Sequence, residues 1–171
     1  MRSFQQHPFE PIYNKDSRVL ILGTLPSPAS RQHDFYYSHP RNRFWPVLAA
    51  LFQTPLPCTK EEKIALILEH NLALWDVLAS CMIDGAADIS ITDTVPHDFS
   101  TVLRESAITK IVCTGQKAWT LYQRLCRPHT GIDAHALPST SPANQRISFD
   151  ELVLHYRTAL TDFSGFSTIT H

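Results

Sequence analysis

Short apolar segments alternate with helical patterns along this chain, and that order restricts its fold more strongly than any other property. The sequence predicts four strands, at residues 18–22, 72–75, 109–113 and 132–137. Helices are predicted between and after them, at residues 43–52, 59–70, 98–106, 116–126 and 148–160. Alternation of this kind is typical of a parallel sheet with helices on both faces. We therefore expect an α/β fold, a three-layer α/β/α sandwich with a central four-stranded parallel sheet.

The segments outside these elements carry weaker signals. Residues 1–17 are predicted to form an irregular entry segment, residues 77–82 are compatible with a helix, and residues 85–96 are typical of a loop. Two helix starts are clearer, because Thr59 and Ser148 each open a capping box.

The composition excludes several classes of protein. The 171 residues are 43% hydrophobic and 18% charged with a net charge of −1, which suits one globular domain over residues 1–171. No apolar run is long enough to span a bilayer and no signal-peptide pattern is visible, so a cytoplasmic protein is expected. The four cysteines and nine histidines show no metal-binding spacing. We therefore expect no metal and no other cofactor, and we interpret the cysteines as reduced and structural.

The first predicted strand runs directly into a long loop. This loop opens with Gly23-Thr24-Leu25-Pro26-Ser27 and closes with Phe35-Tyr36-Tyr37-Ser38-His39-Pro40-Arg41-Asn42-Arg43-Phe44-Trp45. A loop of this length is uncommon without a function, and open α/β folds bind ligands at the carboxyl ends of their strands. Aromatic residues followed by Arg-Asn-Arg indicate a pocket for a flat, polar ring, and a nucleobase is such a ligand.

A second loop, rich in proline and serine, follows the last predicted strand. It reads Leu137-Pro138-Ser139-Thr140-Ser141-Pro142-Ala143-Asn144. If the first and last strands both lie near the centre of the sheet, the two loops face each other across one cleft.

Together these motifs resemble those of the uracil-DNA glycosylase superfamily. The resemblance rests on Gly23–Ser27, Tyr36-Tyr37-x-His39-Pro40-x-Asn42-x-Phe44-Trp45 and Leu137–Asn144, and on the order of strands and helices over nearly the whole chain. The hypoxanthine-DNA glycosylase (DNA-deoxyinosine glycosylase) branch is the most similar, and the segment around Asn42 also resembles the mismatch-specific uracil/thymine glycosylases. The resemblance implies a monofunctional enzyme without a cofactor. Such an enzyme flips a deaminated base out of DNA, hydrolyses its N-glycosidic bond and leaves an abasic site.

Two positions depart from the pattern of most branches. Leu25 stands where an Asp or Asn usually positions the attacking water, and Leu137 stands where other branches have His or Asn. The hypoxanthine branch is similar in lacking both groups and relies on an Asn at the position of Asn42. The resemblance therefore implies a catalytic role for Asn42, and the competing interpretation is that Asn42 only caps the helix that follows.

The remaining site residues follow from the same resemblance. Tyr37 is expected to stack on the flipped base, within a base-binding pocket that comprises Gly23, Thr24, Leu25, Pro26, Tyr37 and His39. Contacts to the DNA backbone are expected from Ser27, Ser139, Thr140, Ser141, Asn144 and Arg146. The other aromatic residues of the first loop are interpreted as core, with Tyr36 undecided. Lys60 and Lys63 are interpreted as a solvated helix face, which predicts no Schiff-base lyase chemistry.

Several functions stay open at this point. The expected substrate is DNA that contains deaminated bases, read by a monomer that removes hypoxanthine from deoxyinosine. The first alternative is uracil or broad deaminated-base excision, because an aromatic pocket alone does not select a purine. The second is a catalytically silent DNA-binding relative, which Leu25 and Leu137 motivate. The third is a hydrolase of free nucleosides or nucleotides.

Overall fold

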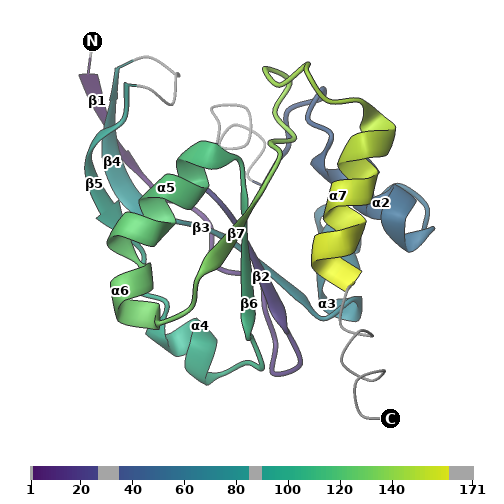
Figure 1. Cartoon of the computed structure of the whole chain (residues 1–171), viewed down its shortest axis with the longest axis horizontal. Coiled ribbons are helices and arrows are strands. Elements are labelled where there is room, and N and C mark those ends of the chain that lie inside the picture. Colours follow the sequence, from purple (N-terminus) through teal and green to yellow (C-terminus); the bar gives the residue numbers. More distant parts are fainter. Residues whose placement is uncertain (1, 27–34, 85–89, 162–171) are drawn as a thin grey trace.

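A four-stranded parallel sheet forms the centre of the molecule (Figure 1). The computed structural model describes residues 2–26, 35–84 and 90–161. The strand order is β3-β2-β6-β7, and every neighbouring pair is parallel. These strands are β2 (Val19–Gly23), β3 (Leu72–Asp76), β6 (Lys110–Thr114) and β7 (Ala134–Leu137). The predicted fold class is confirmed, since helices cover both faces of this sheet.

The side chains of the sheet alternate between two cores. Ile21 packs into the core under α2 (Phe44–Phe52), α3 (Lys60–Glu69) and α7 (Phe149–Thr161). Leu20 and Leu22 point to the opposite core, in keeping with the two-residue repeat of a strand. That second core lies under the group of short helices on the left of Figure 1, which comprises α4 (Ser100–Arg104), α5 (Gln116–Leu125) and α6 (Arg127–Thr130). The structure thus has the three layers that the alternating pattern predicts.

Two of the predicted helix starts are visible as side-chain caps. The hydroxyl of Thr59 accepts a hydrogen bond from the backbone N–H of Glu62 at 3.1 Å, and the hydroxyl of Ser148 accepts one from Glu151 at 3.2 Å. Each cap satisfies a backbone donor that has no partner within the first helical turn. Both capping predictions are confirmed.

A second, antiparallel sheet corrects the prediction for the weaker segments. It has the order β1-β4-β5, formed by β1 (Arg2–Gln6), β4 (Leu78–Asp84) and β5 (Thr92–Pro96). The irregular segment was therefore wrong at residues 2–6 and correct at residues 7–17, while the helix at residues 77–82 and the loop at residues 92–96 were wrong. The register between β4 and β5 shifts twice along the pair, and such irregularity breaks the alternation that identifies a strand in a sequence. The short helix α6 was also not predicted.

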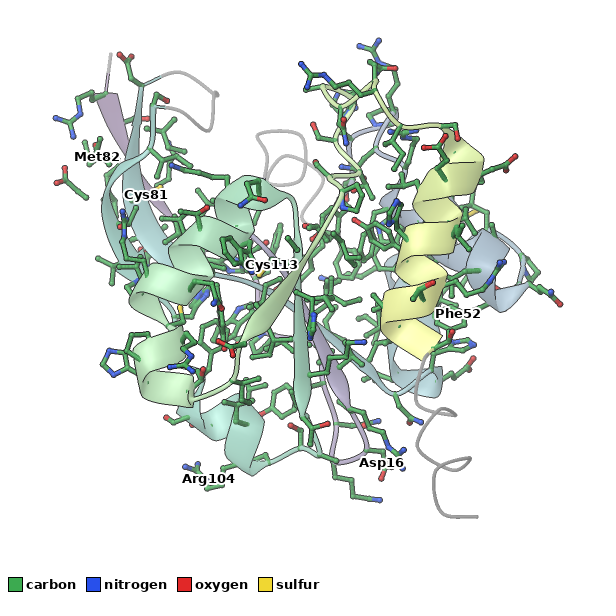
Figure 2. The ribbon with its side chains drawn as sticks, in the orientation of Figure 1. Asp16, Phe52, Cys81, Met82, Arg104 and Cys113 are labelled. Atoms are coloured by element: carbon green, nitrogen blue, oxygen red, sulfur yellow. The ribbon has the colours of Figure 1, made fainter. Side chains whose placement is uncertain are left out.

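The cysteines are free thiols, as expected. Cys81, Cys113 and Cys126 are buried, and Figure 2 shows Cys113 deep in the middle of the molecule and Cys81 on the second sheet. Burial raises the pKa of Cys113 and of Cys126 to about 12, so both stay protonated and act as small apolar side chains. Cys58 is exposed, which corrects its interpretation as a structural residue.

Candidate functional site

The carboxyl end of β2 packs against two polar side chains. A Cβ added to Gly23 would lie 2.5 Å from Oδ1 of Asp76 and 3.1 Å from the hydroxyl of Tyr37. Gly23 and Asp76 are also register partners at the ends of β2 and β3. The resemblance implied that Gly23 is part of the base-binding pocket. The structure supplies a packing reason for glycine at this position, because the carboxylate and the phenol fill the space that a side chain would take.

Asp76 is the group at this edge that sequence reasoning missed. Its side chain is 5% exposed, and Oδ2 lies 2.8 Å from Nε2 of His7. Oδ1, the oxygen beside Gly23, accepts no hydrogen bond from any group in the described part of the chain. The available signal was the acidic residue directly after the apolar strand Leu72–Trp75, at the edge where parallel sheets bind ligands. A buried carboxylate with one oxygen unused is a candidate acceptor for a bound molecule.

Tyr37 lies between Asp76 and the end of β6. Its hydroxyl is 3.0 Å from that of Thr114, and its ring stacks on Phe44 with 3.9 Å between centroids. Burial, together with the nearby charge of Asp76, raises the pKa of Tyr37 well above its ordinary value, so the phenol is uncharged. Its backbone has a φ of 53°, a left-handed conformation in which the loop turns sharply. Phe44 covers one face of the ring, which leaves stacking by a base to the other.

The other aromatic residues of the first loop belong to the core. Phe35, Tyr36, Phe44 and Trp45 are all buried, which confirms the prediction for three of them and settles Tyr36. The hydroxyl of Tyr36 donates to the carbonyl of Glu10 at 2.9 Å. The indole N–H of Trp45 donates to the carbonyl of Tyr36 at 3.0 Å.

Asn42 contacts the start of α2 but is not its N-cap residue, which is Arg43 and carries no side-chain cap. Its Oδ1 accepts a hydrogen bond from the backbone N–H of Phe44 at 2.9 Å. The carboxamide nitrogen makes no hydrogen bond to the described chain. His39 fixes the turn before it, since the His39 carbonyl accepts from the N–H of Asn42 and Nδ1 accepts from that of Arg41 at 3.0 Å. This turn uses only the oxygen of Asn42, so its nitrogen is available for another role.

The two loops meet, although not by the expected route. β7 is an edge strand and β6 separates it from β2, so the last strand is not near the centre. Arg43 joins the loops instead: its backbone N–H donates to the carbonyl of Thr140 at 3.1 Å. Its guanidinium donates to the carbonyls of Ile147 at 2.9 Å and Asn144 at 2.8 Å. Arg43, which is half-buried, therefore holds the segment around Asn42 against the second loop.

The second loop is folded by its own hydroxyls. The hydroxyl of Ser139 accepts from the backbone N–H of Ser141 at 3.1 Å, and Asn144 donates through its amide to the carbonyl of Ser139 at 2.9 Å. Thr140 is 1% exposed, whereas Arg146 is exposed. Backbone-phosphate contacts by these residues stay a prediction. Ser27, the remaining residue of that set, lies outside the described residues.

The rest of the first motif is pinned to the neighbouring strand. The carbonyl of Gly23 accepts from the N–H of Val77 at 2.8 Å, and that of Thr24 accepts from Leu78 at 3.1 Å. Leu25 is partly buried and packs against the second core, while Pro26 is buried beside it. Leu137 is buried as well. Both leucines at the positions of the missing acid and base are thus packing residues.

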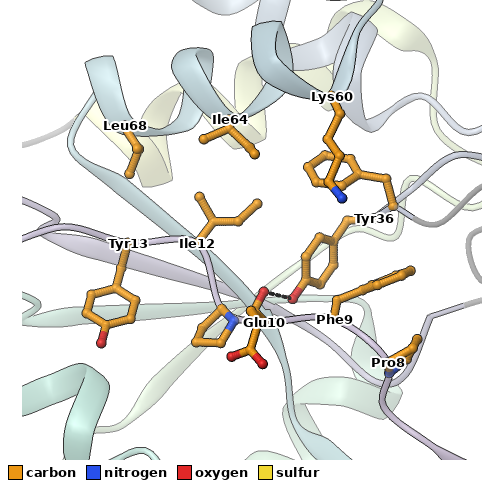
Figure 3. A pocket seen from close by; sticks show the side chains of 11 residues that line it. Pro8, Phe9, Glu10, Ile12, Tyr13, Tyr36, Lys60, Ile64 and Leu68 are labelled. Carbon is orange, nitrogen blue, oxygen red and sulfur yellow. Dashed lines mark hydrogen bonds between the residues drawn. The ribbon is translucent and has the colours of Figure 1, made fainter.

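A cavity of about 430 Å³ lies between residues 8–13 and α3 (Figure 3). Tyr36 and Lys60 line it, whereas Gly23, Tyr37 and Asp76 do not. Lys60 is exposed, as predicted, whereas Lys63 is half-buried. Both ammonium groups lie within 6 Å of the Phe35 ring centroid, at 5.7 and 5.9 Å. Burial also lowers the pKa of Lys63. These contacts are cation–π interactions with core aromatics.

The described residues also bear on metal binding and on membrane insertion. No group of three or more His, Cys, Asp or Glu side chains there could hold a metal ion. No helix in that part of the chain has the length and apolar character that crossing a membrane requires.

Comparisons with known proteins match most of the chain. The model of the "Uracil DNA glycosylase superfamily" matches residues 10–161. A protein from Methanosarcina acetivorans named hypoxanthine DNA glycosylase is 34% identical over 142 residues, which is 82% of this chain and 89% of that protein. A protein of the same name from Methanosarcina barkeri is 29% identical over 139 residues, which is 81% of this chain and 87% of that protein. A solution NMR structure from M. acetivorans, assigned as a candidate uracil DNA glycosylase, superposes with a TM-score of 0.75 at 27% identity, over 93% of this chain and 99% of that one.

Proposed function

This chain belongs to the uracil DNA glycosylase superfamily, and on that basis we propose that it is a DNA repair glycosylase that excises hypoxanthine from deoxyinosine. It is a monofunctional enzyme: the base is flipped out of the DNA, its N-glycosidic bond is hydrolysed, and an abasic site is left. Two similar proteins named hypoxanthine DNA glycosylase support this substrate. We further propose that the protein works as a cytoplasmic monomer without a metal or other cofactor.

The observation that carries the proposal is the unused carboxylate oxygen of Asp76 beside Gly23. Hypoxanthine presents an N–H at N1, whereas adenine presents a lone pair there, so an ionised carboxylate accepts from the first base and repels the second. The discrimination is large because a buried acceptor left unpaired is costly. Adenine is the base from which hypoxanthine is formed by deamination, so this contact would spare undamaged DNA.

Asn42 is the proposed catalytic residue. Its oxygen is engaged at the start of α2, which fixes the side chain and leaves the two N–H donors of the carboxamide for the base or the attacking water. Such a preorganised donor stabilises charge that develops as the base departs. Because Leu25 and Leu137 are apolar, we propose a dissociative hydrolysis that relies on positioning and electrostatics rather than on a strong general base.

The remaining predicted residues surround these two. We propose that the face of Tyr37 opposite Phe44 stacks on the flipped base and that Gly23, Thr24, Leu25, Pro26 and His39 complete its pocket. On the DNA side, we propose that flanking phosphates are held by Ser27, Ser139, Ser141, Asn144 and Arg146. Thr140 is buried and instead holds this loop through its carbonyl, which accepts from the N–H of Arg43. Arg43 ties these two groups of residues together through its backbone and guanidinium contacts.

The second candidate is excision of uracil. The observation in its favour is the same Asp76 oxygen, because uracil also presents an N–H, at N3, to a carboxylate. A duplex with one labelled deoxyinosine, treated with excess protein and then with alkali, separates the candidates when deoxyuridine and undamaged duplexes are run in parallel. Breaks at inosine after alkali support the proposal, and breaks at uracil alone refute it in favour of the second candidate. Binding of abasic DNA without any breaks would instead indicate a silent DNA-binding relative.

A further inference from the structure

His7 is buried against the site although it precedes the parallel sheet in sequence. It lies in the segment after β1, its side chain is 1% exposed, and Nε2 is 2.8 Å from Oδ2 of Asp76. Its backbone N–H donates to the carbonyl of Ala79 at 2.8 Å. The family model matches the chain from residue 10, so His7 lies before the matched residues.

The hydrogen bonds of His7 fix which ring nitrogen carries the proton. The backbone N–H of Phe9 donates to Nδ1 at 3.2 Å, and a nitrogen that accepts a hydrogen bond has no proton of its own. In the neutral ring the proton is therefore on Nε2, from which it is donated to the carboxylate of Asp76. A donor aimed at an ionised carboxylate makes one of the stronger hydrogen bonds in proteins.

Neighbouring rings hold the His7 imidazole in this orientation. His97 packs edge-to-face against it with 4.6 Å between centroids, and Phe9 does so at 5.7 Å. Nδ1 of His97 donates to the backbone carbonyl of Asp76 at 2.8 Å. Burial lowers the pKa of His97 to about 4, so this neighbour is uncharged at neutral pH. Both the side chain and the backbone of Asp76 are thus held by imidazole donors.

From this arrangement we propose that His7 is a positioning residue for base selection. It occupies Oδ2 of Asp76, so that Oδ1 beside Gly23 is the one oxygen left to accept an N–H from the base. The inference rests on the proposed function, because it concerns which base the same site accepts. On this inference, the segment after β1 contributes to base selection in addition to following a strand of the second sheet.

The test compares His7→Gln, whose side-chain amide can replace the Nε2–H donor, with His7→Phe, which keeps the ring and loses the donor. Single-turnover excision is measured on duplexes with deoxyinosine and with deoxynebularine, a purine that has a lone pair instead of an N–H at N1. We expect His7→Phe to lose about 10- to 100-fold in rate on deoxyinosine, the factor for one charge-assisted hydrogen bond. Its preference for deoxyinosine over deoxynebularine should fall as well, and His7→Gln should restore most of both.

Thermal unfolding of each variant separates this role from a structural one, with His155→Phe on the exposed face of α7 as the control for the substitution itself. If His7→Phe does not fold, His7→Asn takes its place, because its shorter amide falls short of Oδ2. A folded variant without the donor that keeps wild-type rate and preference overturns the inference alone. A wild-type protein that leaves deoxyinosine intact overturns the proposed function, and the inference with it.

Discussion

Two substitutions at Asn42 separate its structural role at the start of α2 from its proposed role in catalysis. Asn42→Ala removes the Oδ1 acceptor for the N–H of Phe44, and loss of one such hydrogen bond costs about 1 kcal/mol. For a chain of this size that lowers Tm by roughly 2–4 °C. Asn42→Asp keeps an acceptor oxygen at the same place, and a negative charge at a helix N-terminus is favourable. Its Tm should therefore equal or exceed that of the wild type.

The activity of the two variants should not follow their stability. Asn42→Asp replaces the amide nitrogen by an oxygen, so the donor that we assign to the base or water is lost. Removal of one preorganised donor costs about 100-fold in rate. We expect both variants to show this loss in single-turnover excision of hypoxanthine under excess enzyme, with alkaline cleavage as the readout. Full activity in a normally folded Asn42→Asp protein would refute the catalytic assignment and leave Asn42 with only a structural role at the start of α2.

Three further predictions concern the groups around Asp76. Gly23→Ala should destabilise the protein by about 1–3 kcal/mol through overpacking and reduce excision, because its Cβ displaces Oδ1 of Asp76. In a double-mutant cycle, Gly23→Ala should destabilise the Asp76→Ala protein less than it destabilises the wild type. Tyr37→Phe keeps the ring that stacks on Phe44 and should retain most base binding, whereas Tyr37→Leu should weaken base binding by about 1–3 kcal/mol. The measurement is the affinity of each variant for a duplex with an uncleavable deoxyinosine analogue, and equal affinities would argue against stacking. Because the pKa of His97 is lowered to about 4 in the folded protein from an ordinary 6.5, the unfolded chain binds more protons between these values; stability in urea should fall as the pH drops through this window, and His97→Gln should flatten that dependence.

The strands of the parallel sheet can be predicted because burial on both faces requires apolar residues at successive positions in the sequence. All five residues of β2 are buried, and a continuous apolar run of this kind has few alternatives when helices separate it from the next one. β1 shows the opposite case. Four of its five residues are exposed, and its partner β4 lies more than 70 residues away. Its pairing depends on a long-range contact that no local pattern records.

The residues of the candidate site also differ in whether a local sequence pattern or a long-range contact reveals them. Tyr37 and Asn42 lie in a motif that can be recognised from neighbouring residues. The structure places the Tyr37 hydroxyl at the carboxyl edge of the sheet, beside Gly23 and Thr114, and Asn42 at the start of α2. His7 and Asp76 are 69 residues apart, and each alone resembles an ordinary polar residue at the end of a segment. Only the folded chain shows that the two share a hydrogen bond. Arg43 is similar, since its function as a tie between loops depends on carbonyls about 100 residues further along the chain.

In the proposed site, the Asp76 carboxylate would favour selection of the base and slow cleavage of its N-glycosidic bond. A carboxylate at position 76 that accepts the N–H of the base raises the electron density of the ring, and that opposes departure of the base with the bonding pair of electrons. Leu25 and Leu137 supply no acid to offset this effect. The compensating donors must come from other residues, and the two unused N–H groups of Asn42 are the source that we propose. On this reasoning, the loss in Asn42→Asp should be smaller in an Asp76→Asn background, where the opposing negative charge is gone, and a double-mutant cycle on single-turnover rates measures that coupling.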